Sequence, residues 1–243
     1  MVINQSKCNI ISFYKSYKNP LINEYHLDNK LINRVNQIKD LGVTFDSRLT
    51  FEHHITETVQ KCNRVHGFVL RSSKPFHSLD LTLTLYNSLV RSVLEYNSII
   101  WYPHQEYLRN KIERIQKKLT NVLFYRFNNF YPTYPNNIAY RTLCEMLQLP
   151  TLSARSEIAQ MIFIFKMMNN QIDTDVSENI GLRVPLAKLR PNSGDFFSTS
   201  SPNAILINSL QTLNKYYTHC NLDLSSTLRK FKSVANSLVN NFT

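Results

Sequence analysis

The spacing of hydrophobic residues changes near residue 48. Before that point, short runs rich in β-forming residues occur at 8–13 and 41–45, and runs at 24–27 and 31–35 flank Asp28-Asn29. An Asp-Asn pair between two such runs is typical of a two-residue hairpin turn. Residues 1–47 are therefore expected to form a small segment of strands.

Beyond residue 48 the hydrophobic residues recur at the helical spacing of about 3.6 residues. A first helix is expected from about residue 49, capped by Ser47 or Thr50 and ended by Pro75. A second helix of about 18 residues follows, capped by Ser78 or Asp80. The residues expected to face the core are Phe51, Ile55, Thr58, Val59, Cys62, Val65, His66 and Val69 in the first helix, and Leu81, Leu85, Tyr86, Leu89, Val90, Val93 and Leu94 in the second.

A third helix is expected near 105–125, and the Asn- and Pro-rich stretch after it, 128–138, is predicted to be a linker. Next come a short helix at 139–147 and one at 153–170 that is apolar almost all round, as in helices sandwiched between others. The core side of the third helix is expected to consist of Leu108, Ile112, Ile115, Leu119, Val122 and Leu123. The remaining elements expected are a loop at 183–203 and helices at 204–213 and 224–239.

These patterns predict a mainly α fold, in which a small N-terminal β-hairpin/strand segment precedes a helical bundle and a further helical tail. The expected division is 1–47, 48–127, 128–138 and 139–243. Four glycines among 243 residues argue against a large all-β fold or a nucleotide-binding α/β fold, because both depend on tight glycine turns.

The balance of charge favours an anionic partner. Lys and Arg number 28 against 17 Asp and Glu, a net charge of +11. Residues 1–130 hold 18 of these cations and 10 of the acids, so most of the excess lies there. Such an excess indicates nucleic acid first and an anionic membrane second.

Membrane insertion and secretion are not expected. The most apolar run, 158–168, is too short to span a bilayer, and the polar N-terminus is unlike a secretory signal. The four cysteines are scattered without a CxxC pair, which fits reduced thiols inside the cell. The protein is therefore expected to be intracellular, in the nucleus or the cytoplasm.

The third helix carries a run of cations beside its apolar side. At about 100° per residue, Lys111, Arg114, Lys117 and Lys118 fill one arc of roughly 120°. Such an arc can follow a phosphate backbone, although an ordinary solvated helix face looks the same. On the first helix, Lys61 and Arg64 also lie away from the apolar stripe; a membrane-binding face would instead need Trp, Phe and Leu there.

Residues 39–43 are interpreted as part of a strand that contains Gly42. That glycine would allow a ligand or another backbone to approach closely, although a simple β-bulge is the preferred interpretation from the residues alone. No active site is expected: Asp40 and Asp46 flank the strand without a third acid, and no paired aspartates occur. A metal at His53, His54 and Cys62 is disfavoured by their spacing.

The order of several segments resembles a known family. These are SKCNIISF, KDLGVTFDSRLTFEHHI, GFVLRSSKPF, LYNSLVRSVLEYNSIIWYP and IERIQKKL. In this order they resemble the region that follows the catalytic palm in reverse transcriptases of jockey-type non-LTR (LINE) retrotransposons. The resemblance covers roughly residues 1–125 closely, and 140–243 look like the weaker C-terminal tail of the same proteins.

The resemblance implies a role for each segment. Residues 1–47 would be the end of the palm, with a primer grip that includes Lys39, Leu41 and Gly42, and 48–127 would be the thumb. The implied partners are an RNA/DNA template–primer duplex and the missing palm domain. The family does not specify contacts for Lys61, Arg64 or the four cations of the third helix, which rest on helical geometry alone.

The resemblance also implies what the chain lacks. The family's [FY]-A-D-D turn does not occur here, so neither the catalytic aspartates nor the Mg²⁺ that they hold in the parent enzyme is expected in this chain. The expected function is binding of template–primer without polymerisation by the chain alone, and no cofactor. The alternative is a helical interaction module, or a decayed gene product, without any role in nucleic-acid binding.

Overall fold

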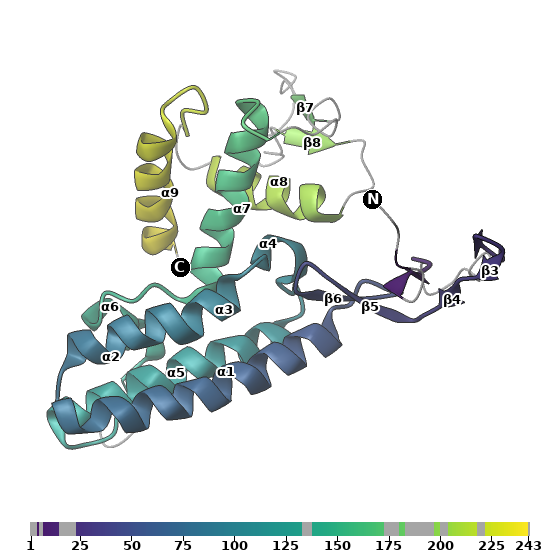
Figure 1. The fold of residues 1–243 in the computed structure, drawn as a ribbon. Helices are drawn as coiled ribbons and strands as arrows, with labels where there is room; N and C mark the ends of the chain where they lie inside the picture. The colour runs from purple at the N-terminus through teal and green to yellow at the C-terminus, as the bar shows by residue number, and fades with distance from the viewer. Residues whose placement is uncertain are drawn as a thin grey trace. The chain divides into compact units, whose positions relative to one another are not determined.

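A computed structural model describes residues 4, 7–14, 23–132, 138–172, 180–182, 197–199, 204–217 and 222–242. The chain forms two compact units (Figure 1). The first unit comprises residues 1–97 and 103–115, and the second comprises 98–102 and 116–243. The described residues are mainly helical with short two-stranded sheets, so the predicted fold class is confirmed. The four-segment division stays a prediction.

The first unit begins with two small strand pairs. Strands β1 (Asn9–Ile10) and β4 (Asn33–Arg34) pair in parallel, and β2 (His26–Leu27) and β3 (Lys30–Leu31) pair antiparallel. Asp28 and Asn29 between the latter have φ of 47° and 61°. Positive φ at both central residues is what a type I′ turn requires, so the predicted hairpin is confirmed.

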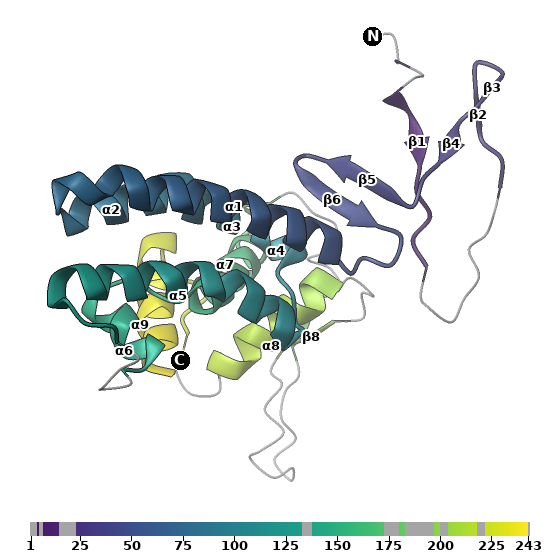
Figure 2. The same cartoon turned by 90° about the horizontal axis from the view of Figure 1, so that it is seen from below.

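A second antiparallel hairpin joins β5 (Gln37–Asp40) to β6 (Val43–Asp46). The predicted strand at 39–43 is wrong in its middle, and so is the preferred β-bulge, because Leu41 and Gly42 form the turn, with φ of 44° and 84°. Both residues have the positive φ of a two-residue hairpin, which Gly tolerates without cost. Figure 2 shows this hairpin beside the start of the first long helix, α1 (Glu52–Ser73).

Helix α1 starts on a cap that differs from the expected one. Phe51, and not Ser47 or Thr50, occupies the N-cap position and has no side-chain cap. The Thr50 hydroxyl nevertheless accepts from the N–H of Glu52, the first helical residue, at 3.5 Å. The Asp46 carboxylate at the end of β6 accepts hydrogen bonds from the backbone N–H groups of Arg48, Thr50 and Phe51 at 2.8–3.1 Å. Burial opposes ionisation of Asp46, but these bonds outweigh it and hold its pKa below the ordinary 3.8.

The predicted second helix contains a π-helical turn. It consists of α2 (Leu79–Tyr86), the π segment η3 (Asn87–Arg91) and α3 (Ser92–Glu95), and the Ser78 hydroxyl caps it by accepting from the Leu81 N–H at 3.2 Å. The wider turn holds an extra residue, which rotates the following side chains. Tyr86, just before this turn, and Val90 within it are buried against α1, whereas Leu89, also predicted to face the core, is 41% exposed.

The second unit is built around α7 (Leu152–Met168). This helix packs between α8 (Ala204–Tyr217) and α9 (Leu228–Phe242), as its all-round apolar sequence predicts (Figure 1). Phe165 of α7 stacks on Phe231 of α9 with ring centroids 4.4 Å apart. The unit also contains α4 (Ser98–Trp101), α6 (Tyr140–Met146) and the second part of α5 (Glu106–Asn128), the predicted third helix.

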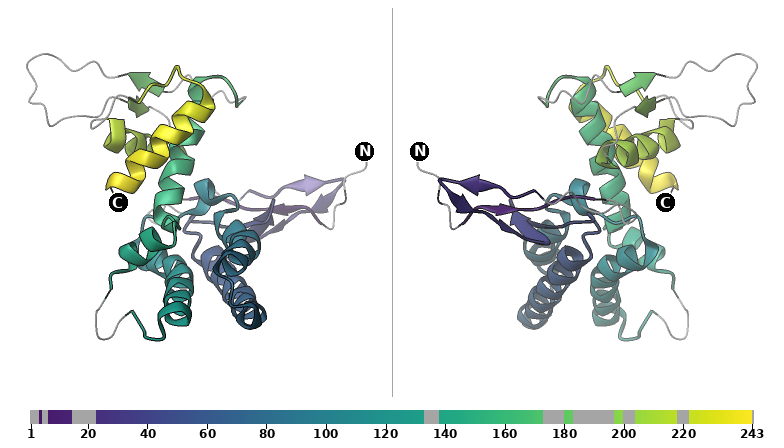
Figure 3. Two further views of the ribbon diagram at one scale, coloured as in Figure 1. Left: turned by 90° about the vertical axis from the view of Figure 1, so that its left-hand side faces the viewer. Right: turned by 90° about the vertical axis from the view of Figure 1, so that its right-hand side faces the viewer.

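A strand pair in the second unit is absent from the sequence prediction. Strands β7 (Ile180–Leu182) and β8 (Phe197–Thr199) lie side by side, although β8 falls within the predicted loop at 183–203 (Figure 3). Asn214 of α8 fixes β8, because its amide both accepts from the Phe197 N–H at 3.0 Å and donates to the Phe197 carbonyl at 2.9 Å. The rest of that predicted loop, 183–196 and 200–203, lies outside the described residues.

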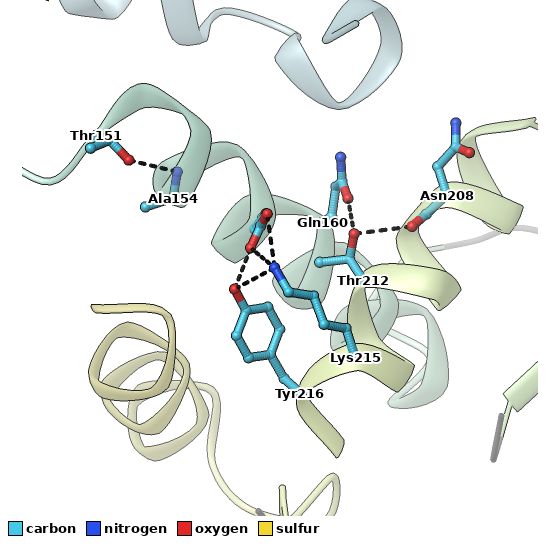
Figure 4. A network of polar contacts seen from close by, with 8 residues as sticks. Thr151, Ala154, Gln160, Asn208, Thr212, Lys215 and Tyr216 are labelled. Carbon is cyan, nitrogen blue, oxygen red and sulfur yellow. Dashed lines mark hydrogen bonds and ion pairs between the residues drawn. The ribbon is translucent and has the colours of Figure 1, made fainter. Parts of the chain in front are cut away.

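Polar side chains join α7 to α8 (Figure 4). The Glu157 carboxylate accepts from the hydroxyl of Tyr216, which is 1% exposed, and from the Lys215 ammonium at 3.3 Å. One turn further along α7, the Gln160 amide oxygen accepts from the Thr212 hydroxyl. Burial, together with the bond to Glu157, raises the pKa of Tyr216, so the phenol stays a donor at neutral pH.

Replacing Asp46 with Asn is expected to destabilise the chain by about 1–2 kcal/mol, because it weakens the acceptor for three backbone donors in the segment that leads into α1. The folded-state pKa of Asp46 is lowered, so its contribution is present above pH 3.8 and is lost as the pH falls through the folded-state value. Urea denaturation at several pH values measures both effects. Asp40→Asn, at an exposed carboxylate of the same hairpin, is the matched control and should leave stability nearly unchanged.

Replacing Tyr216 with Phe should destabilise the chain by about 1 kcal/mol, because a buried hydrogen bond is lost without a change in the ring. Tyr125→Phe, at an exposed tyrosine of the same unit, provides the control. Thermal denaturation followed by circular dichroism compares the two. Equal melting temperatures for both variants would contradict a stabilising role for the bond to Glu157.

Candidate functional site

The β5–β6 turn is held against the helices of the first unit by Tyr96, just beyond α3. The Tyr96 hydroxyl donates to the Leu41 carbonyl at 3.1 Å. The ring also lies against Gly42, where an added Cβ would come within 3.2 Å of Tyr96 Cε1. The Leu41 side chain is 80% exposed at the tip of the hairpin. Tyr96 thus holds the turn in place, and the apolar side chain of Leu41 is exposed to solvent.

His54 of α1 makes a second attachment to the hairpin. Its Nδ1 accepts from the Thr44 N–H of β6 at 3.3 Å, and both residues are buried. Burial lowers the pKa of the imidazole; Lys39 and His53 lower it further, and Glu57 raises it. The neutral form that this environment favours is the one able to accept the bond.

A pocket of about 490 Å³ lies between the hairpin, α1 and α3. It brings together three of the predicted residues, Lys39 and Gly42 from the hairpin and Lys61 from α1. Thr58, Ser92 and Tyr96 also line it. Two lysines in the wall suit an anionic ligand, and Glu57 in the same wall partly offsets their charge.

The other predicted cations lie on the helices outside this pocket. Arg64 follows Lys61 by one helical turn and is exposed. Lys111, Arg114 and Lys118 of α5 are exposed as well. Lys111 reaches α1, since its ammonium lies 3.4 Å from the Thr56 hydroxyl. These four cations are therefore accessible to a ligand.

Lys117 differs from the other cations of α5. It is half-buried, and its ammonium lies 5.1 Å from the centroid of the Tyr140 ring, a cation–π contact within the second unit. Next to it, Gln116 is fully buried and donates to the Pro150 carbonyl at 3.0 Å. The buried face of α5 is thus wider than the apolar stripe predicted from the sequence, and Lys117 lies at its border.

Metal binding and membrane insertion find no counterpart in the part of the chain that the structure describes. No cluster of three or more His, Cys, Asp or Glu side chains suited to a metal ion occurs among these residues. Nor does any described helix combine the length and hydropathy needed to cross a membrane.

The sequence alone did not identify two residues of this site, Tyr96 and His54. The sequence prediction gives Tyr96 no role and weighs His54 only as a metal ligand that its spacing disfavours. Gly42, inside the run 41–45, is the one residue of that run that could have indicated a break in the strand. Nothing in the sequence signals which helical side chains would meet the hairpin tip.

One curated protein is similar to this chain. It is described as "Probable RNA-directed DNA polymerase from transposon X-element" of Drosophila melanogaster, and it is 28% identical over 123 residues. The match covers 50% of this chain but 13% of the relative's length, so the chain spans a small part of that protein. No family model and no solved structure matches the chain. The comparison supports a relationship to a transposon reverse transcriptase; the jockey type and the place after the palm stay predictions.

Replacing Gly42 with Ala is expected to destabilise the first unit by about 1–2 kcal/mol. The residue has a positive φ, and the new methyl group would press against the Tyr96 ring. Gly67→Ala is the control: this glycine lies inside α1, its new Cβ would meet the flexible end of Arg71, and helix propensity should make the change neutral or slightly stabilising. Urea denaturation that ranks the two variants in the opposite order would contradict this account of the turn.

Proposed function

We propose that this chain is the part of a jockey-type non-LTR reverse transcriptase that follows the catalytic palm, and that it binds an RNA/DNA template–primer duplex. The similarity to a transposon RNA-directed DNA polymerase supports this proposal, as does the resemblance of the motifs in the first 125 residues. In this proposal, 1–47 are the end of the palm, 48–127 the thumb, 128–138 a linker and 139–243 a C-terminal helical region.

The observation that carries the proposal is the accessibility of the cations. Six of the seven Lys and Arg residues singled out from the sequence are exposed, namely Lys39, Lys61, Arg64, Lys111, Arg114 and Lys118. Ammonium and guanidinium groups in such positions gain affinity for phosphates by releasing counterions, without reading base sequence. A protein that holds a duplex of any sequence needs this kind of contact.

The hairpin tip would act as the primer grip of the site. Lys39 supplies a charge beside the turn, Gly42 allows the turn to seat on Tyr96, and Leu41 offers an exposed apolar surface for a sugar or base. Lys117 would contribute less than its neighbours, because its ammonium already lies over Tyr140. The proposed partners place the protein in the nucleus or the cytoplasm, and the palm domain would be a second partner.

The proposed role of the chain alone is binding without polymerisation. In the parent enzyme, palm aspartates hold the Mg²⁺ ions that phosphoryl transfer requires, and the tetrapeptide that carries them in this family is missing from this sequence. A primer-extension assay with Mg²⁺ and dNTPs should therefore give no product. Sustained incorporation by the purified chain would overturn this part of the proposal.

The binding itself is tested by the salt dependence of affinity. A fluorescently labelled RNA/DNA duplex should bind with a log–log salt slope that becomes shallower by about 2–3 in the triple variant Lys111→Ala, Arg114→Ala, Lys118→Ala, because each lost phosphate contact removes just under one unit. Fluorescence anisotropy at several salt concentrations measures the slope.

A second triple variant controls for net charge. Arg229→Ala, Lys230→Ala, Lys232→Ala removes the same number of exposed cations from α9 and should leave the slope close to that of the wild type. Equal changes in both variants would show that charge acts without a defined surface. No binding by the wild type at low salt would favour the alternative, a helical interaction module without a role in nucleic-acid binding.

A further inference from the structure

The β5–β6 hairpin is attached to the helices through its backbone at two places. Tyr96 donates to the carbonyl of Leu41 at the tip, and His54 accepts the N–H of Thr44 on β6. In the first contact the phenol is the donor and a backbone carbonyl is the acceptor. The second depends on the protonation state of an imidazole.

The geometry of the hairpin explains why Thr44 turns its N–H toward α1. With a two-residue turn, Asp40 and Val43 form the closing hydrogen-bonded pair, so the next pair, Lys39 and Thr44, is a non-hydrogen-bonded one. The N–H of Thr44 then points away from β5 and needs another acceptor, because Thr44 is buried. His54 Nδ1 is that acceptor.

We propose that His54 is a protonation-sensitive latch: its neutral imidazole holds β6 on α1, and its protonation releases the hairpin. An imidazolium has no acceptor, so it cannot keep the Thr44 bond and would place a second N–H donor against the first. The consequence for nucleic-acid affinity rests on the proposed function, because it assumes that Lys39, Leu41 and Gly42 contact the duplex.

The groups around His54 determine the pH at which its imidazole is protonated and the latch opens. Glu57 of α1 favours a positive charge on His54, whereas Lys39 of β5 and His53 of α1 oppose it. Lys61 of α1 lines the same pocket and adds another basic side chain. From the α3 side the pocket is lined by Ser92, Val93 and the phenol of Tyr96. Burial is the largest influence and lowers the pKa of His54 from 6.5. The latch is therefore closed at neutral pH and opens as the pH falls through a value below 6.5.

A direct test follows the Thr44 amide without any nucleic acid. Hydrogen exchange by NMR should show the Thr44 protection factor of the wild type falling by about tenfold between about pH 7.5 and a pH one unit below the midpoint of the His54 titration. His54→Asn should abolish this dependence, since an Asn amide oxygen can replace Nδ1 but does not titrate. His53→Asn, at the exposed neighbouring imidazole, should keep it.

The wild type alone supplies a second measurement in case His54→Asn folds poorly. The fall in Thr44 protection should share its midpoint with the titration of the His54 ring protons, and the amide of Val90, in the buried core of the same unit, should not follow it. Loss of Thr44 protection that is unrelated to the His54 titration, or that persists unchanged in His54→Asn, would overturn the latch.

Binding measurements then separate the latch from the proposed function. The affinity of the wild type for the RNA/DNA duplex, divided by that of His54→Asn, should fall by about threefold or more over the same pH range. A ratio that rises on acidification would mean that the added charge on His54 attracts phosphate directly, and it would overturn the coupling to affinity. If neither protein binds the duplex, the proposed function fails while the exchange experiment still decides the latch.

Discussion

The first unit depends on the Asp46 carboxylate, which lies at the end of strand β6 and binds the segment that leads into helix α1. A helix leaves its first N–H groups without intrahelical partners, and the usual solution is a side chain at the N-cap. At α1 the N-cap residue Phe51 has no side-chain cap. The Asp46 carboxylate, five residues earlier on β6, instead accepts from three backbone N–H groups of the segment that leads into the helix. The carboxylate thereby fixes the base of the hairpin to the start of α1. Because Thr44 and His54 lie on either side of that junction, their contact depends on it.

Much of the fold follows from periodicity. The helical spacing from residue 48 onward predicted α1, α5 and α7 closely, because long amphipathic or fully apolar segments have few alternative structures. The turn at Asp28-Asn29 was equally clear from residue type. Leu41-Gly42 was harder, since Leu rarely adopts a positive φ and the run 41–45 looks continuous. Pairing of β7 with β8 joins segments too far apart in sequence for local patterns to reveal.

The sequence predicts which charged residues the candidate site contains, but not how they are arranged in space. A helical wheel separates cations from apolar residues, and six of the seven cations are indeed exposed. It cannot show that Gln116 is fully buried or that Lys117 lies over Tyr140, because both depend on which elements pack beside α5. Tyr96 and His54 were missed for a related reason. Each forms a hydrogen bond with the backbone of a hairpin more than nine residues away in sequence. Because every residue has a backbone, the sequence does not show which backbone groups a side chain will bind.

The π-helical turn at Asn87–Arg91 has a consequence for how this protein tolerates change in length. Such a turn is equivalent to a one-residue insertion in an α-helix, and it shifts every later side chain by about 100° around the helix axis. Tyr96 follows this segment by a few residues, so its alignment with Leu41 depends on the extra residue. A single-codon deletion within 87–91 would restore a regular α-helix yet swing the phenol away from the hairpin, whereas substitutions at the same positions would preserve the alignment.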